Sequence, residues 1–437
     1  MSFMGAPGAC FMGPHSRIGG PAGLVPSLNL NFIDDYAWSP VGVTTATSLV
    51  TVTRASDGYA PNAAGVYTLF SSNVLRRTNL GALVEESRTN SIRNNSMQGA
   101  SAPSTYPTNW SAFVGGDGAL SVVGTGTENG IDYIDIRYTG TSAGVGSALI
   151  LLESSTQIVA ADTQTWTSSL FAKIAGGSTS GAAFANRINF RTAAGASVAL
   201  QDVAFTPTSA GLGTQRVPSN VFTASGGTIA RVTNSITFTS SSGSTDITLR
   251  IGWPQLELGA FATSPIRTTS AAATRAADNI SLTSFAGAGV NAAAGTLYAE
   301  FVVPSAPTTS ANPAILNIGD GTNANRDTLF LSQASGKAAS GNTFAASANQ
   351  GRIDGSTAFS AGATVKAAYA FAANDRAIVT NGGAAGTSST GTRPTGFSLF
   401  EIGTGVSFST TPLNGYLRRV AYFPTRLTNA QLQALTT

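Results

Sequence analysis

The chain has 437 residues, of which 10% are charged, and its formal net charge is +3. That charged fraction is far below the roughly 25% of an ordinary soluble domain. The basic residues of the chain are few and scattered, which excludes a nucleic-acid-binding surface. The length predicts about three domains, and abundant Gly, Ala, Ser and Thr favour β-sandwiches over helical bundles.

The first segment, residues 1–26, is interrupted so often by Gly and Pro that no regular element is expected there. It carries two short apolar motifs, Phe3-Met4-Gly5 and Phe11-Met12-Gly13. Phe and Met are enriched in protein interfaces. We therefore predict an extended virion-attachment peptide anchored by Phe3, Met4, Phe11 and Met12, with disorder as the alternative.

The same segment contains the sole cysteine and the sole histidine, Cys10 and His15. An intrachain disulfide, a Cys/His zinc site and a rigid Ser-His-Asp triad are therefore excluded, and we expect no cofactor and no catalytic metal. Carboxylate chemistry, as in glycoside hydrolysis, is the enzymatic class that remains. Neither a signal peptide nor a membrane-spanning run is present in the sequence, so we expect cytoplasmic synthesis and no membrane insertion.

The rest of the chain reads as short strands separated by turn residues, which predicts an all-β fold. Residues 27–90 form a β-rich N-terminal region, and residues 91–265 a first sandwich with strands at 131–138, 166–173, 184–191, 230–239 and 245–253. A connector, 266–294, precedes a second sandwich at 295–437. A helix near the end is predicted from the capping-box spacing of Thr428 and Gln431.

Several motifs resemble virion proteins of bacteriophages. Residues 53–56 (TRAS), Arg77 and residues 81–90 (GALVEESRTN) are similar to a segment of phage tail and fibre proteins that leads into a carbohydrate-binding-module-like jelly roll. That module usually ends in a segment similar to residues 255–266 (QLELGAFATSPI) and 274–278 (TRAAD). The last block of the chain resembles a concanavalin-A-like lectin/glucanase domain of the laminin-G kind. The similar segments are residues 295–301, 318–322, 381–383 and 414–424.

The resemblance implies two tandem antiparallel β-sandwiches, a jelly roll and then a concanavalin-A-like domain, in a fibre or spike on the surface of a phage or phage-like particle. Its expected partners are other virion proteins, through the N-terminal peptide, and host cell-surface polysaccharide, with a homotrimer favoured. We expect multivalent glycan binding without catalysis, because the glucanase pattern Glu-x-Asp-x-x-Glu is missing from the sequence. A purely structural decoration or adaptor protein and a polysaccharide depolymerase are the alternatives.

Candidate glycan-binding residues lie in two groups. Tyr106, Asn109 and Trp110 lie in one loop. The Trp110 ring either stacks on a sugar or packs into the core and closes one end of the sandwich. In the lectin-like domain the candidates are Asp320, Asn323, Asn325, Arg326, Asp327, Asn374 and Asp375, although Asn and Asp are also the residue types that turns prefer.

Two further sets of acidic residues are not predicted to be catalytic. Glu85, Glu86 and Arg88 favour an ion network over a carboxylate site. Asp132 and Asp135 fall on opposite faces of one strand and cannot form a catalytic pair.

Overall fold

A computed structural model describes residues 24–116, 118–142, 146–178, 181–240, 243–305, 312–332, 335–405 and 412–437. The predicted anchor residues Phe3, Met4, Phe11 and Met12 lie outside these ranges. The described residues form strands β1 to β31 and one α-helix, α1 (Asn429–Thr436), so the predicted all-β class is confirmed. No helix in this part of the chain is long and apolar enough to cross a membrane.

Two compact units share the chain, and neither is continuous in sequence. Unit 1 combines the described parts of Met1–Thr53, Leu80–Glu85 and Asp278–Thr437, and unit 2 combines Arg54–Asn79 and Glu86–Ala277. The sequence predicts a separate region at 27–90, whereas the structure divides that region between the two units. The physical reason is strand pairing, because early strands complete sheets whose other strands come much later.

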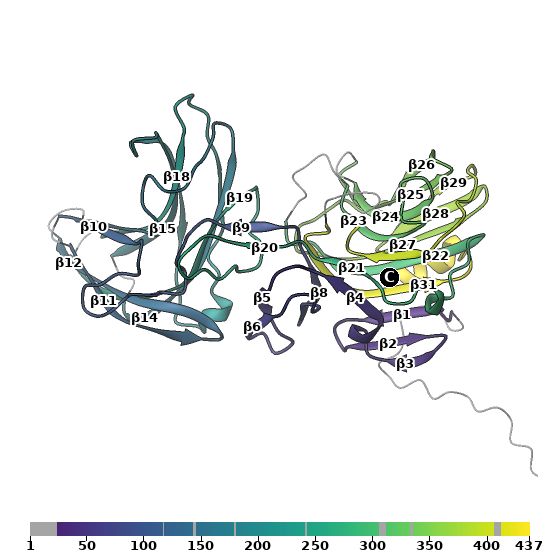
Figure 1. Ribbon diagram of the computed structural model, residues 1–437, viewed down its shortest axis with the longest axis horizontal. Helices are drawn as coiled ribbons and strands as arrows, with labels where there is room; N and C mark the ends of the chain where they lie inside the picture. The colour runs from purple at the N-terminus through teal and green to yellow at the C-terminus, as the bar shows by residue number, and fades with distance from the viewer. Residues whose placement is uncertain are drawn as a thin grey trace, which may run out of the picture. The chain divides into compact units, whose positions relative to one another are not determined.

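Unit 1 is a sandwich of two antiparallel sheets. The strand order in the first sheet is β29 (Gly386–Ser388), β28 (Asp375–Thr380), β27 (Thr364–Ala372), β22 (Ala294–Val302), β31 (Gly415–Phe423), β1 (Leu28–Asn31), β2 (Tyr36–Ser39), β3 (Gly42–Thr44). A further strand of this sheet, β8 (Gly81–Val84), pairs with β31. The order in the second sheet is β26 (Ala348–Asp354), β25 (Lys337–Ala345), β24 (Arg326–Ser332), β23 (Ala314–Gly319), β30 (Leu399–Ile402), β21 (Asn279–Leu282), β4 (Val50–Thr53). Figure 1 shows purple β1 beside yellow β31, where Leu28 is in register with Tyr422. Helix α1 has the predicted capping box at Thr428.

Unit 2 is a sandwich of two five-stranded antiparallel sheets (Figure 1). One sheet has the order β10 (Ser111–Gly115), β13 (Gly146–Leu151), β18 (Arg231–Ser240), β15 (Ala182–Arg191), β16 (Ser197–Phe205). The other has the order β11 (Gly118–Glu128), β12 (Ile131–Ser142), β19 (Gly243–Leu258), β14 (Thr165–Gly177), β17 (Asn220–Thr223). Their facing sides bury one apolar core that includes Ile134, Ile136 and Phe190.

Short elements complete both units. In unit 2, β5 (Gly58–Pro61) pairs with β6 (Tyr67–Phe70), β9 (Arg88–Asn90) pairs with β20 (Ala273–Arg275), and β7 spans Arg77–Thr78. The 3₁₀ turns are η1 (Thr47–Leu49) and η3 (Ala286–Ala288) in unit 1, and η2 (Leu212–Thr214) in unit 2. Within unit 2, aromatic contacts hold the β5–β6 hairpin against β14, with the Tyr67 and Phe171 ring centroids 5.2 Å apart.

Candidate functional site

The outer side of the β11-β12-β19-β14-β17 sheet, here called the charged face, gathers ionised side chains on a chain that has few. Along β12, Ile134, Ile136 and Tyr138 are buried in the core. Alternation therefore places Tyr133, Asp135 and Arg137 on the opposite, outer side. The charged face was not among the predicted site residues, although the alternating pattern of residues 131–138 already contains two of its charged residues, Asp135 and Arg137.

Strand register sets oppositely charged residues side by side on three neighbouring strands. Asp135 of β12 lies opposite Arg250 of β19, and Arg250 lies opposite Lys173 of β14. Arg250 donates from Nε and Nη2 to the two carboxylate oxygens of Asp135, both at 2.8 Å. Its guanidinium also lies over the Tyr133 ring, 3.6 Å from the centroid.

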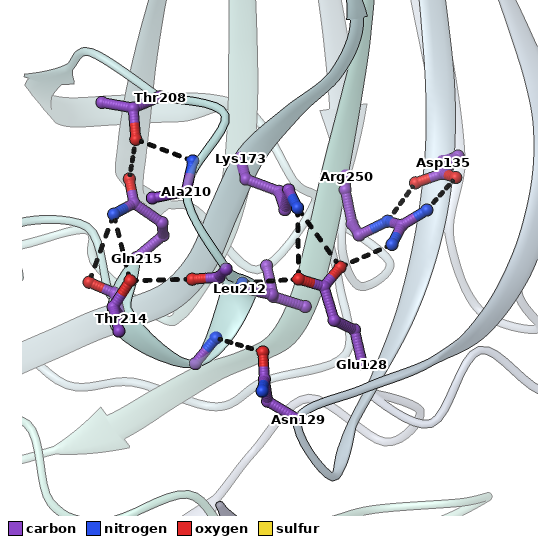
Figure 2. Close-up of polar contacts among 12 residues, drawn as sticks. Glu128, Asn129, Asp135, Lys173, Thr208, Ala210, Leu212, Thr214, Gln215 and Arg250 are labelled. Atoms are coloured by element: carbon purple, nitrogen blue, oxygen red, sulfur yellow. Dashed lines mark hydrogen bonds and ion pairs between the residues drawn. The ribbon is translucent and has the colours of Figure 1, made fainter. Parts of the chain in front are cut away.

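Glu128, at the end of β11, connects this row to a loop (Figure 2). Its Oε2 accepts from Arg250 Nη1 at 2.5 Å, and its Oε1 accepts from Lys173 Nζ at 3.1 Å and from the Leu212 backbone N–H at 2.8 Å. Leu212 itself is buried against Ile131, so the loop is fixed by packing as well.

The local sequence explains why Glu128 stands there. The two-residue turn Asn129-Gly130 has positive φ at both positions, 52° and 79°, which is the conformation that Asn-Gly favours in tight hairpins. Opposite Tyr133 stands Gly126, where a Cβ atom would lie 2.6 Å from the Tyr133 hydroxyl oxygen. Any larger residue at position 126 would therefore require the Tyr133 ring to move.

Hydrogen bonding favours the charged forms of Glu128 and Arg250 in this cluster. Burial alone would raise the pKa of Glu128, but the Leu212 N–H and then Arg250 and Lys173 lower it below the ordinary value. The hydrogen bond to Asp135 raises the pKa of Arg250 further. The cluster is thus internally neutralised, and it stiffens the sheet rather than offering a free charge.

A second pair on the charged face is far more accessible. Arg137 donates from Nε and Nη2 to Asp246 at 2.8 and 2.6 Å, and the two side chains are 50% and 55% exposed. The hydrogen bond from Arg137 lowers the pKa of Asp246. An open pocket of about 500 Å³ adjoins the pair, lined also by Gly177, Ser178, Ser244 and Thr248. Fixed cation, carboxylate and hydroxyl groups therefore surround one space.

The predicted loop residues of unit 2 do not present a stacking ring. Trp110 is 7% exposed within the core, and its indole Nε1 donates to the backbone oxygen of Asn94 at 2.8 Å. Tyr106 is half-buried against the same core, and Asn109 has a positive φ of 77°. The geometry corresponds to the core alternative for Trp110, since a buried ring has no face to offer a sugar.

The predicted rim of unit 1 is divided among separate places. Asp320 accepts from Thr322 and from Asn325 within the turn that precedes β24, where Asn323 and Arg326 also hydrogen-bond to each other. Asp327 is fully buried instead, as described below. Asn374 and Asp375 lie at the β27–β28 turn, where Asp375 forms an ion pair with Arg426 at 2.8 Å. Among the residues that the structure describes, Asp320, Asn323, Asn325 and Arg326 therefore lie together at one turn, and the other candidates of unit 1 lie elsewhere.

Three of the other acidic residues considered in the sequence, Glu86, Asp132 and Asp135, have cationic partners. Glu86 and Arg88 form an ion pair at 2.6 Å. Asp132 pairs with Arg267 at 2.6 Å, whereas Asp135 pairs with Arg250, so the two aspartates of β12 bind different arginines. Across the described ranges no group of three His, Cys, Asp or Glu side chains is placed to hold a metal ion.

Comparison with known proteins gives remote structural similarities. No protein-family model matches the chain, and no curated protein sequence matches it significantly. A structure of the CBM40 of the Ruminococcus gnavus IT-sialidase bound to α2,3-sialyllactose has 15% identity and a TM-score of 0.29, over 34% of this chain and 84% of that one. A second structure of the same module has 16% identity and a TM-score of 0.26, over the same shares of the two chains.

A further similarity extends over more of the chain. The CBM22-1–CBM22-2 tandem of Paenibacillus barcinonensis Xyn10C has 12% identity and a TM-score of 0.25, over 79% of this chain and 100% of that one. Structural neighbours of the chain therefore include carbohydrate-binding modules. At these TM-scores none of the similarities identifies a ligand for this chain.

Proposed function

We propose that the chain binds carbohydrate, without cleaving it, through the charged face of unit 2. The observation that carries the proposal is the half-exposed Arg137–Asp246 pair beside the hydroxyl-lined pocket. Sugar hydroxyls both donate and accept hydrogen bonds, and arginine donors next to carboxylate acceptors meet both needs. The Glu128–Arg250 cluster, on the same face of the sheet as the pair, holds the sheet surface in place, which reduces the entropy lost on binding.

Replacing Arg137 by methionine is expected to weaken binding to host-surface polysaccharide by roughly tenfold or more, because the hydrogen bonds that charged groups make are the stronger ones. Since the pKa of Asp246 is lowered, its carboxylate stays ionised, and binding should not change between about pH 5 and pH 8. The measurement is a glycan array followed by titration with the polysaccharide that binds.

A matched control is available on the other sheet. Arg187 donates to Asp202 in the same two-bond geometry, both at 2.7 Å, across β15 and β16. Arg187→Met should therefore leave carbohydrate binding unchanged. Equal losses in the two variants, or failure of the wild type to bind any glycan, would count against the proposal.

We further propose that this binding serves host attachment by a virion protein, in homotrimers whose repeated weak sites gain avidity. The support is the sequence resemblance to phage fibre proteins and the apolar motifs of residues 1–26. Deleting residues 1–26 is expected to leave a folded, carbohydrate-binding protein that no longer incorporates into particles. Quantifying the protein in purified particles measures this, and normal incorporation of the truncated chain would refute the attachment role.

A further inference from the structure

A second pocket of unit 2 lies away from the charged-face pocket and shares no lining residue with it. It has a volume of about 390 Å³ and is bordered by the β5–β6 hairpin and by residues that follow β19. Its lining includes Asp57, Tyr59, Leu69, Pro265 and Arg267. This volume falls within the range of about 300–1,000 Å³ that is usual for small-molecule sites.

One wall of this hairpin pocket is apolar and rigid. Tyr59 and Leu69 are directly opposite each other in the β5–β6 register. The Tyr59 ring packs edge-on against Trp253, with centroids 4.9 Å apart, and Trp253 is 2% exposed. Leu69 is 46% exposed, so this apolar surface is available to a ligand.

Polar groups with spare bonding capacity face the same space. Arg267 donates from Nε to Asp132 at 2.6 Å, and no acceptor among the described residues meets its Nη atoms. Within the same ranges the Tyr59 hydroxyl has no hydrogen-bond partner, and burial raises its pKa, so it stays protonated. Asp57 accepts the Ser72 N–H through Oδ1 at 3.0 Å, and its Oδ2 has no protein donor in the described residues.

We propose that the hairpin pocket is a second carbohydrate subsite that takes a neutral pyranose. The C–H face of the sugar ring lies on Tyr59 and Leu69, while its hydroxyls accept from Arg267 and Tyr59 and donate to Asp57. A neutral sugar is favoured over an acidic one because Arg267 is already paired with Asp132, and the Asp57 carboxylate that faces the pocket would repel a second carboxylate. The inference shares only the ligand class with the proposed function, since its residues are different.

Saturation-transfer NMR on the full chain tests this subsite, with methyl β-D-glucopyranoside, methyl β-D-galactopyranoside, methyl α-D-mannopyranoside and glucuronate as probes at millimolar concentration. At least one methyl glycoside should receive saturation at its ring protons, and glucuronate should bind more weakly. Tyr59→Phe keeps the ring and is expected to weaken binding roughly threefold to tenfold, and Arg267→Met by roughly tenfold or more.

Tyr67→Phe is the matched control, because Tyr67 packs on the same Trp253, with centroids 5.8 Å apart, but does not line the pocket. Asp57→Asn provides a second variant should Arg267→Met fail to fold. The subsite is overturned if no glycoside binds, if glucuronate binds best, or if folded Tyr59→Phe and Asp57→Asn proteins bind as the wild type does. Arg137→Met tests the charged face separately. If Arg137→Met loses polysaccharide binding while Tyr59→Phe binds the glycosides as the wild type does, the proposed function stands and the subsite is refuted.

Discussion

Replacing Arg393 by methionine is expected to lower the free energy of unfolding of unit 1 by about 3–5 kcal/mol, because it leaves a buried carboxylate without its cation. Asp327 is 0% exposed and Arg393 10%, and the guanidinium donates to both carboxylate oxygens at 2.8 and 2.5 Å. Burial, and then the charge of Asp327, raise the pKa of Tyr369 to about 12, as expected for a site without solvent. Urea denaturation followed by circular dichroism measures the loss.

Two comparisons separate this effect from ordinary loss of packing. The double variant Asp327→Asn/Arg393→Met should be more stable than Arg393→Met alone, since no charge is then buried unpaired. Arg187→Met, which disrupts a partly exposed pair, should cost only about 0–1 kcal/mol. A loss below about 1 kcal/mol for Arg393→Met would show that the pair is not buried as described.

Trp110→Ala is expected to cost about 3–5 kcal/mol in unit 2, because it removes a large side chain from the core. The variant also leaves the Asn94 backbone oxygen without the indole N–H that it accepts at 2.8 Å. Trp110→Phe should cost less, because most of the ring volume is kept. The measurement is a thermal melt run beside a cell-adsorption assay.

Phe113 provides the control for Trp110, because it lies on the adjacent strand β10 and is 67% exposed. Phe113→Ala should change stability by no more than about 0.5 kcal/mol. If Trp110→Ala instead melted within a few degrees of the wild type and lost adsorption, the sugar-stacking role would stand after all.

The fold class could be predicted because its signals are local. The alternating run at 131–138 lies inside β12, and the capping box at Thr428 starts α1 as expected. Strand partners are not local: nothing near Leu28 indicates that it pairs with Tyr422. For that reason the exchange of segments between the two units was not visible in the sequence.

The candidate site, like the fold, could be predicted from the sequence only where its signals are local. Asp135 and Arg250 are 115 positions apart, and only the β12–β19 register brings them together. In the loop containing Tyr106 and Trp110, the same residue types suit both an exposed binding ring and a buried one, so composition could not decide. Asn323 and Asn325 lie in a turn as expected, whereas Arg326 and Asp327 begin strand β24, and the Asp320 carboxylate hydrogen-bonds to its own neighbours in that turn.

The position of β31 between β22 and β1 has a consequence for biosynthesis. Every strand of unit 2 has been synthesised once residue 277 is translated, so unit 2 can complete its fold before unit 1. β1 must wait for its partner at residues 415–423, which at about 5–20 residues per second is a delay on the order of tens of seconds. During that interval β1, which carries Leu28 and Leu30, has an unpaired edge, and such an edge is open to association between neighbouring nascent chains on one polysome.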